Sequence, residues 1–258
     1  MFNTFSKSFF AGRRPLIVSN PTQLPTGFVW LNADLGSVAN FGSALTDGST
    51  VSTWKDVYAG SHDANKAGNA SVKPIWKSNI LNGLGVVRFD GVNDSLNINP
   101  VNTPAPSLQG ATGYSLFVVA KSTSLSGSRY ITTTDTGGFA LFYNGSNWAV
   151  QSAGGIGTAS SIGNTTSFNQ YSIIYSGSAI GNSNRLKLRF NGNDTPLNFG
   201  SSSVGTSTSP AAQYLYIGEN GTAGFFAGDI AEIILYATTL SDEQIIAQET
   251  YLRNHWSL

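Results

Sequence analysis

The chain has 258 residues, enough for one large all-β domain or two small ones. Charged residues make up only 11%, and 14 Lys and Arg balance 14 Asp and Glu, so no overall charge draws the chain to nucleic acid or to an anionic membrane. Cysteine is absent and only His62 and His255 represent histidine, which excludes disulfide scaffolds, thiol catalysis, cysteine-ligated zinc and multi-histidine metal centres. No stretch has the roughly 18 apolar residues of a membrane span.

Residues 1–27 differ in composition from the rest of the chain. Prolines at 15, 21 and 25 discourage a helix interior or a central strand, and polar residues interrupt the apolar ones, unlike in a secretory signal. We therefore expect the chain to stay in the compartment where it is made. We expect an extended arm that docks either on its own domain or on a neighbouring subunit, with a disordered tail or an extra edge strand as the alternatives. The candidate docking residues are Phe2, Phe5, Phe9, Phe10, Arg13 and Arg14.

Residues 28–236 carry the pattern of many short strands. Runs rich in β-branched and aromatic residues alternate with turns rich in Gly, Ser, Thr and Asn, without helical patterns between them. Asn144-Gly145 and Asn191-Gly192 are expected at hairpin tips because both residue types tolerate positive φ. The pattern predicts an all-β sandwich or barrel, with strands at 28–31, 85–89, 114–120, 171–175, 185–190, 214–217 and 230–236.

One helix is predicted at the end of the chain, over residues 241–254. Ser241 can cap its N-terminus, and Gln244 three residues later completes a capping box. Asp242 and Glu243 lie at the positive end of the helix dipole. We expect this helix to pack on the sandwich, so that residues 28–258 form one domain.

Three segments, in order and with similar spacing, carry a resemblance to a known superfamily. They are VWLNAD at 29–34 with VSTWKD at 51–56, NGLGVVRFDGVNDSL at 82–96, and GDIAEIILY at 228–236 followed by LSDEQI and YLRNHW. The set resembles the concanavalin A-like, laminin-G-like jelly-roll superfamily, and in particular its phage-encoded, virion-associated members. The resemblance implies a two-sheet antiparallel jelly roll with one concave face. It does not fix the function, because this fold hosts lectins, glucanases, adhesion modules and virion proteins.

A glycosidase would need two carboxylates on one face of a strand. The best candidates are Asp229 and Glu232, but a spacing of three puts them on opposite faces of a regular strand. No Gly-x-Ser-x-Gly motif accompanies His62, so a serine hydrolase is not indicated either. The sequence therefore predicts a protein that is not an enzyme.

The resemblance also suggests calcium, because laminin-G-like and related lectin domains often hold this ion with Asp and Asn side chains. Here Asp90, Asn93 and Asp94 cluster at a tight turn, and hard oxygen ligands suit Ca²⁺. The alternative is an ordinary turn, in which Asp and Asn bond their own backbone. No other cofactor is expected.

Glycan binding needs exposed aromatic rings for sugar faces and amides for sugar hydroxyls. The predicted hairpin tip offers Tyr143, Asn144, Asn147 and Trp148, and the strand at 214–217 offers Tyr214 and Tyr216. The alternative is that these rings build the sandwich core.

Together these features favour a non-enzymatic structural or decoration protein on the capsid or tail surface of a bacteriophage virion. Made in the host cytoplasm, it would be anchored by its arm to other virion proteins or to copies of itself, with glycan adhesion as an additional role. The alternative is a carbohydrate-binding lectin module or receptor-binding protein, and a glucanase comes third. Neither nucleic acid nor membrane insertion is expected.

Overall fold

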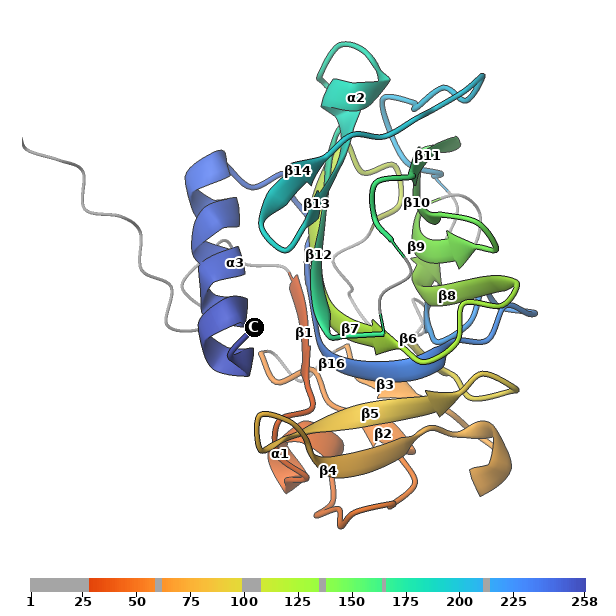
Figure 1. The fold of residues 1–258 in the computed structure, drawn as a ribbon, viewed down its shortest axis with the longest axis vertical. Helices are drawn as coiled ribbons and strands as arrows, with labels where there is room; N and C mark the ends of the chain where they lie inside the picture. The colour runs from red at the N-terminus through yellow and green to blue at the C-terminus, as the bar shows by residue number, and fades with distance from the viewer. Residues whose placement is uncertain (1–27, 59–61, 99–107, 135–137, 164–165, 211–213) are drawn as a thin grey trace, which may run out of the picture.

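The computed structural model describes residues 28–58, 62–98, 108–134, 138–163, 166–210 and 214–258. The predicted arm, residues 1–27, lies outside the described residues. Two antiparallel sheets face each other, and one long helix lies against the outer side of one of them (Figure 1). The predicted all-β antiparallel sandwich is confirmed, and its two open sheets with a C-terminal helix are consistent with a jelly roll.

The first sheet, sheet A, contains the longest strands. Its order is β14-β13-β12-β7-β16-β5-β4, and β1 pairs with the second half of β16. The bounds are β1 Phe28–Asn32, β4 Ile75–Leu81, β5 Leu84–Asp90, β7 Gly113–Ser122, β12 Asn169–Ser176, β13 Leu186–Phe190, β14 Asn193–Thr195 and β16 Ala227–Tyr236.

The second sheet, sheet B, is made of shorter strands in the order β11-β10-β9-β8-β15-β6-β3-β2. The bounds are β2 Thr53–Trp54, β3 Ala64–Asn65, β6 Leu96–Ile98, β8 Ser128–Thr134, β9 Phe139–Asn144, β10 Trp148–Ser152, β11 Gly155–Ala159 and β15 Leu215–Ile217. Three short helical turns also occur, at α1 Val38–Phe41, η2 Ala70–Val72 and α2 Asn182–Arg185.

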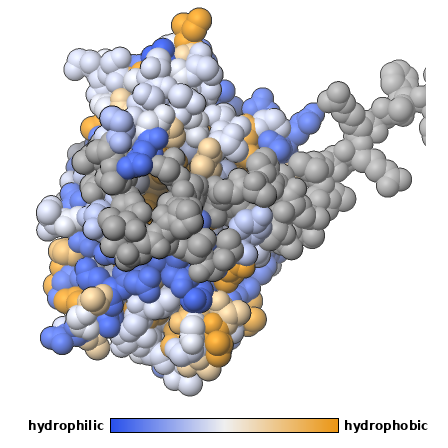
Figure 2. All heavy atoms as spheres, turned by 180° about the vertical axis from the view of Figure 1, so that it is seen from behind, coloured by the Kyte–Doolittle hydropathy of each residue, from blue (hydrophilic) through white to orange (hydrophobic). Residues whose placement is uncertain are grey.

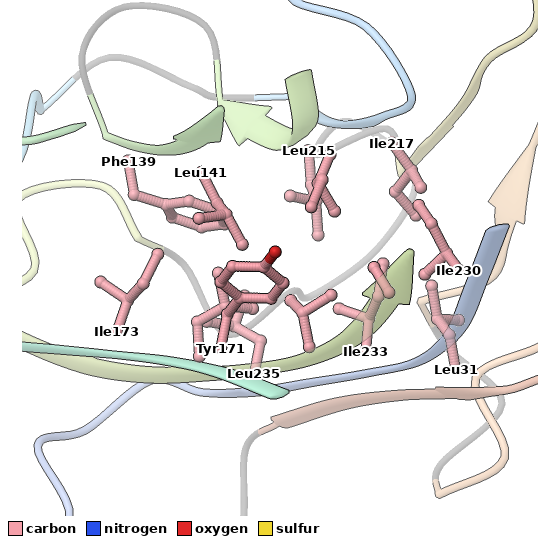
Figure 3. Close-up of a cluster of buried hydrophobic side chains, with 14 of the residues drawn as sticks. Leu31, Phe139, Leu141, Tyr171, Ile173, Leu215, Ile217, Ile230, Ile233 and Leu235 are labelled. Atoms are coloured by element: carbon pink, nitrogen blue, oxygen red, sulfur yellow. The ribbon is translucent and has the colours of Figure 1, made fainter. Parts of the chain in front are cut away.

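The core lies between the sheets and follows from alternation along the strands. Leu186 and Leu188 are buried while Lys187 between them is exposed, as the pattern predicted, although Arg185 ends α2 instead of joining the strand. Each large apolar side chain buried in this way contributes on the order of 1.5–3 kcal/mol. Figure 3 shows the two inner faces meeting, with Phe139, Leu141, Leu215 and Ile217 opposite Leu31, Tyr171, Ile173, Ile230, Ile233 and Leu235.

Helix α3 (Asp242–Trp256) confirms the predicted C-terminal helix and extends two residues further than expected. The capping box is present, because Ser241 Oγ accepts from the Gln244 amide at 3.3 Å and Gln244 Oε1 accepts from the Ser241 amide at 2.9 Å. Leu252 and Trp256 pack on the outer side of sheet A against Ile234. Within the described residues, no helix combines the length and apolar character needed to cross a membrane.

The coloured surface visible in Figure 2 is mostly hydrophilic or intermediate, and its apolar areas are small. The exposed large apolar side chains come from separate parts of the chain: Leu35, Val38, Val92, Ile180, Ile246 and Leu258. Scattered apolar residues of this kind are ordinary for a protein surface. A functional site is therefore expected among polar groups.

Candidate functional site

The outer sides of the two sheets differ in what covers them. Helix α3 covers the outer side of sheet A, where Phe117, Val119 and Ile234 pack against it. In the described part of the chain, no helix packs on the outer side of sheet B. This outer side is therefore the face on which a sheet-based binding site can be built.

One row of residues crosses this face from edge to edge. Strand register places each of its members opposite the next, and all point away from the core because their strand neighbours point into it. The middle of the row, Thr133 and Ala140, is buried. The row runs through Thr53, Asn65, Asn97, Tyr216, Thr133, Ala140, Gln151 and Ile156.

We call the accessible first half, Thr53, Asn65, Asn97 and Tyr216, the polar row. Asn65 is exposed and the other three are half-buried. Adjacent strands lie about 4.8 Å apart, so the four residues span roughly 14 Å. That span suits a ligand of two or three small rings.

Hydrogen bonds fix the first two members of the polar row. Thr53 Oγ1 donates to Asn65 Oδ1 at 2.9 Å, and Asn65 Nδ2 donates to the Asp63 carbonyl at 2.8 Å. The amide of Asn97, next in the row, makes no hydrogen bond to any described residue. Its donor and acceptor are thus open to a ligand.

Tyr216 supplies the aromatic ring of the polar row. Its ring stacks on Tyr214 with the centroids 5.8 Å apart and an interplanar angle of 20°. The following loop lies against the same ring at Gly221, where φ is +92° and a Cβ would come within 3.2 Å of the ring carbons. Glycine is needed at this position for both reasons, and the loop holds the ring in place.

A polar cleft of about 410 Å³ opens beside the polar row at the β2 edge. Thr53 and Asn65 belong to both, so the row and the cleft form one continuous surface. Lys55 Nζ and Asp63 Oδ2 form an ion pair of 2.7 Å in the cleft wall. The remaining lining residues are Phe41, Gly42, Ser43, Leu45, Thr50, Val51 and Ser52. Its volume lies within the roughly 300–1,000 Å³ of small-molecule sites.

The predicted hairpin site does not present its aromatic rings. Tyr143 and Trp148 are only 4% and 0% exposed, because both point into the core, where Trp148 packs on Tyr171 at 4.9 Å. Asn144 is at the exposed tip, but its Oδ1 accepts from the amides of Ser146 and Asn147 and shapes the turn. The hairpin therefore does not form the predicted sugar site, because two buried rings cannot stack on a sugar.

The predicted calcium ligands form a hydrogen-bonded turn. Asp90 Oδ1 accepts from the amides of Val92, Asn93 and Asp94 at 2.8–3.4 Å, and Asp94 Oδ2 accepts from the Asp90 amide at 2.9 Å. Burial raises the pKa of Asp94 to about 6, which weakens it as a ligand. No group of three carboxylates or histidines that suits a metal occurs in the described ranges. These residues fit the turn better than a calcium site.

The face assignment of Asp229 and Glu232 was wrong. Strand β16 has a bulge between Ile230 and Glu232, so Ile230 and Ile233, three residues apart, both point into the core. Asp229 and Glu232 consequently lie on the same outer side of sheet A. Their spacing therefore does not exclude a catalytic pair of carboxylates. Whether the two side chains could act on a substrate depends on the groups around them.

Protein groups enclose each of these carboxylates. Asp229 is fully buried and receives Arg88 Nε at 2.6 Å and Nη2 at 3.0 Å, with Lys121 Nζ at 3.2 Å. Glu232 is fully buried beneath α3, and burial raises its pKa to about 7. Its oxygens accept from Trp30 Nε1 at 2.6 Å, Trp256 Nε1 at 2.5 Å and Tyr251 Oη at 3.2 Å. These contacts give both carboxylates a structural role.

Of the polar row, Thr53, Asn65 and Asn97 were not predicted as site residues from the sequence. Strands β2 and β3 have two residues each, too few to show alternation, so Thr53 and Asn65 carried no signal. Asn97 follows buried Leu96 and precedes buried Ile98, a pattern that three residues only hint at. Only Tyr216 was identified beforehand, through the strand at 214–217.

No protein-family profile matches the sequence, and no curated protein matches it. Among solved structures, Trypanosoma rangeli sialidase aligns with a TM-score of 0.58 and 16% identity over 90% of this chain and 33% of its own. The same sialidase in complex with the inhibitor DANA gives 0.57 and 14%, over 88% of this chain. The Ruminococcus gnavus IT-sialidase CBM40 domain gives 0.48 and 14%, over 64% of this chain and 96% of its own.

This chain spans about a third of the length of the sialidases it resembles. At such low identity the likeness concerns the fold, and it carries neither the activity nor the ligands of those proteins. None of these structures bears on the predicted virion role. The chain is thus a two-sheet antiparallel β-sandwich, the fold that these structures share with it.

Proposed function

We propose that this chain is a non-enzymatic, lectin-like carbohydrate-binding domain, with the polar row and the adjoining cleft as its binding surface. The observation that carries the proposal is the juxtaposition of Asn65, Asn97 and Tyr216 on three neighbouring strands, on the side of sheet B that no described helix covers. A planar amide can both donate to and accept from sugar hydroxyls. A half-buried tyrosine ring beside it can add an apolar contact with the carbon side of a sugar.

The scaffold suits this role because the side chains stand on strands instead of loops. Register fixes the order Asn65, Asn97, Tyr216, and contacts with Tyr214 and Gly221 restrict the position of the tyrosine ring. Such pre-ordering lowers the entropy lost on binding. The hydroxyls of Thr53, Ser43 and Thr50 extend the polar surface into the cleft.

Glycan-array binding followed by titration of the strongest hit tests the proposal. We expect Asn97→Ala and Tyr216→Ala each to weaken binding by about tenfold or more, equivalent to about 1.4 kcal/mol. Gln151→Ala is the matched control, because this residue belongs to the same row at the opposite end and should leave binding unchanged. Absence of binding to any glycan, or equal loss in the control, would contradict the proposal.

We also propose, as a second function, attachment to a bacteriophage virion through residues 1–27. The supporting observation is in the sequence: four phenylalanines in the first ten residues, followed by Arg13 and Arg14. Burying each ring is worth on the order of 1.5–3 kcal/mol, too little to order some two dozen residues without added backbone hydrogen bonds. Strand addition to a neighbouring copy or another virion protein would supply them.

A variant that begins at Gly27 tests the attachment. It should keep its thermal stability and lose incorporation into particles, measured by co-sedimentation. Full-length protein with Arg13 and Arg14 both changed to Ala should be intermediate. Normal incorporation of the shortened chain would transfer the anchoring role to the sandwich surface.

A further inference from the structure

We infer that the saccharide recognised by the polar row and its cleft is uncharged, a neutral hexose or N-acetylhexosamine oligosaccharide instead of an acidic sugar. The inference rests on the proposed function and names its ligand class. The groups that the surface offers are amides, hydroxyls and one aromatic ring. The charged residues around this surface are already paired with one another, and this pairing indicates an uncharged ligand.

The cation inside the cleft is committed to a protein carboxylate. Lys55 Nζ lies 2.7 Å from Asp63 Oδ2, and Asp63 Oδ1 accepts from the Asp56 amide at 3.0 Å. An acidic ligand that took Lys55 would leave the partly buried Asp63 without its counter-ion. A new pair at the same lysine would therefore bring little net gain, because Asp63 and the ligand would compete for one partly exposed ammonium group.

A second cation beside the polar row is committed as well. Lys66 follows Asn65 directly, donates to Ser95 Oγ, and lies 3.4 Å from Glu219 Oε1. Glu219 is only 6% exposed, so its charge depends on this lysine for compensation. Asp94 is also buried nearby and interacts electrostatically with Lys66.

A third lysine lies at the rim of the cleft. Lys73 Nζ donates to Ser52 Oγ at 3.2 Å and pairs with no carboxylate among the described residues. The three lysines Lys55, Lys66 and Lys73 are nevertheless matched by three carboxylates in the same region, those of Asp63, Asp94 and Glu219. When these carboxylates are ionised the local charges cancel, so the region offers an anion no net attraction.

Matched pairs of oligosaccharides test this ligand class. Each neutral probe is compared with the same probe carrying a sialic acid, a uronic acid or a sulfate, by titration with the full chain. We expect each acidic member to bind at least about tenfold more weakly than its neutral partner. We expect binding of the neutral member to stay constant between about 50 and 500 mM NaCl, because no ion pair forms.

Lys73→Met is the informative variant and Lys187→Met, on sheet A, is its control. Both should bind the neutral probe within about twofold of the parent chain. Tighter binding of an acidic member, lost in Lys73→Met, would overturn the neutral assignment while the carbohydrate-binding function stands. Absence of binding to both members of every pair would instead contradict the proposed function, and the assignment would fall with it.

Discussion

Glu232 Oε2 accepts a 2.5 Å hydrogen bond from the indole of Trp256, and both side chains are completely inaccessible to solvent. This contact joins the central strand β16 to the last turn of α3. It explains why the helix continues to Trp256 instead of ending at residue 254. A buried carboxylate is tolerated here because three side chains donate to it.

Replacing Trp256 by Phe should lower the free energy of unfolding by about 2–3 kcal/mol, because a hydrogen bond to a buried charged group is lost. Urea denaturation followed by fluorescence or circular dichroism measures this. Adding Glu232→Gln to the variant should restore part of the loss, since the amide needs less compensation than a carboxylate. Equal stability of the single variant and the parent would show that this bond contributes nothing.

Stability should fall as the pH rises from about 4.5 to about 7. Burial raises the pKa of Glu232 from 4.5 to about 7, and the bond to Asp34 raises the pKa of His255, so the folded state binds protons more tightly than the unfolded state. Below pH 4 stability should instead fall as the pH falls, because the pKa of Asp34 is lowered in the folded state. Burial raises this pKa, but hydrogen bonds to His255 and Asn40 outweigh the effect of burial.

Denaturant midpoints at pH 5 and pH 8 check this dependence. Glu232→Gln should flatten the profile over this range, because it removes the titrating group and keeps the shape of the side chain. Asp94→Asn serves as a comparison, since burial raises the pKa of Asp94 to about 6 in a different part of the fold. A midpoint that increases towards pH 8 would contradict the prediction.

Ser241→Ala should cost about 1 kcal/mol, because it removes the acceptor for the Gln244 amide at the start of α3. Thr250→Ala is the control: this exposed residue is in the same helix and bonds only within it, through the Ile246 carbonyl and the Arg253 side chain. Thermal unfolding of the two variants compares them. A loss no greater for Ser241→Ala than for Thr250→Ala would remove the cap assignment.

We expect no release of reducing ends from a panel of polysaccharides, including β-glucans. The reason differs from the one that the sequence suggested: Asp229 and Glu232 do share a face, but Arg88 and Lys121 enclose the first, and three donors enclose the second. Hydrolysis that disappears in Glu232→Gln would identify an enzyme. Hydrolysis that survives in this variant would point to carboxylates elsewhere.

Local signals made part of the fold predictable. The capping box over Ser241 and Gln244 and the alternation around Leu188 depend on residues within a few positions of one another, and both were found as expected. The bulge in β16 has no such signal. It arises because β16 must match β7 on one side while pairing with β5 and then β1 on the other.

The candidate site was the least predictable part, because register creates it. Tyr143 and Trp148 look like an exposed pair at a hairpin, yet a two-residue period cannot tell which face of a strand points inwards. Asn97 and Tyr216 are 119 positions apart and meet only because β15 pairs with β6. Local patterning contains no information on that pairing.

Strand β15 has three residues, and it alone joins β6 to β8, so sheet B falls into two pieces without it. Strand β16 occupies the corresponding position in sheet A, between β7 and the pair β5 and β1. Both central strands lie after residue 214. A chain emerging from the ribosome therefore has two divided sheets with open edges until residue 236 is free. Premature termination anywhere before that point should yield aggregating fragments instead of smaller folded domains.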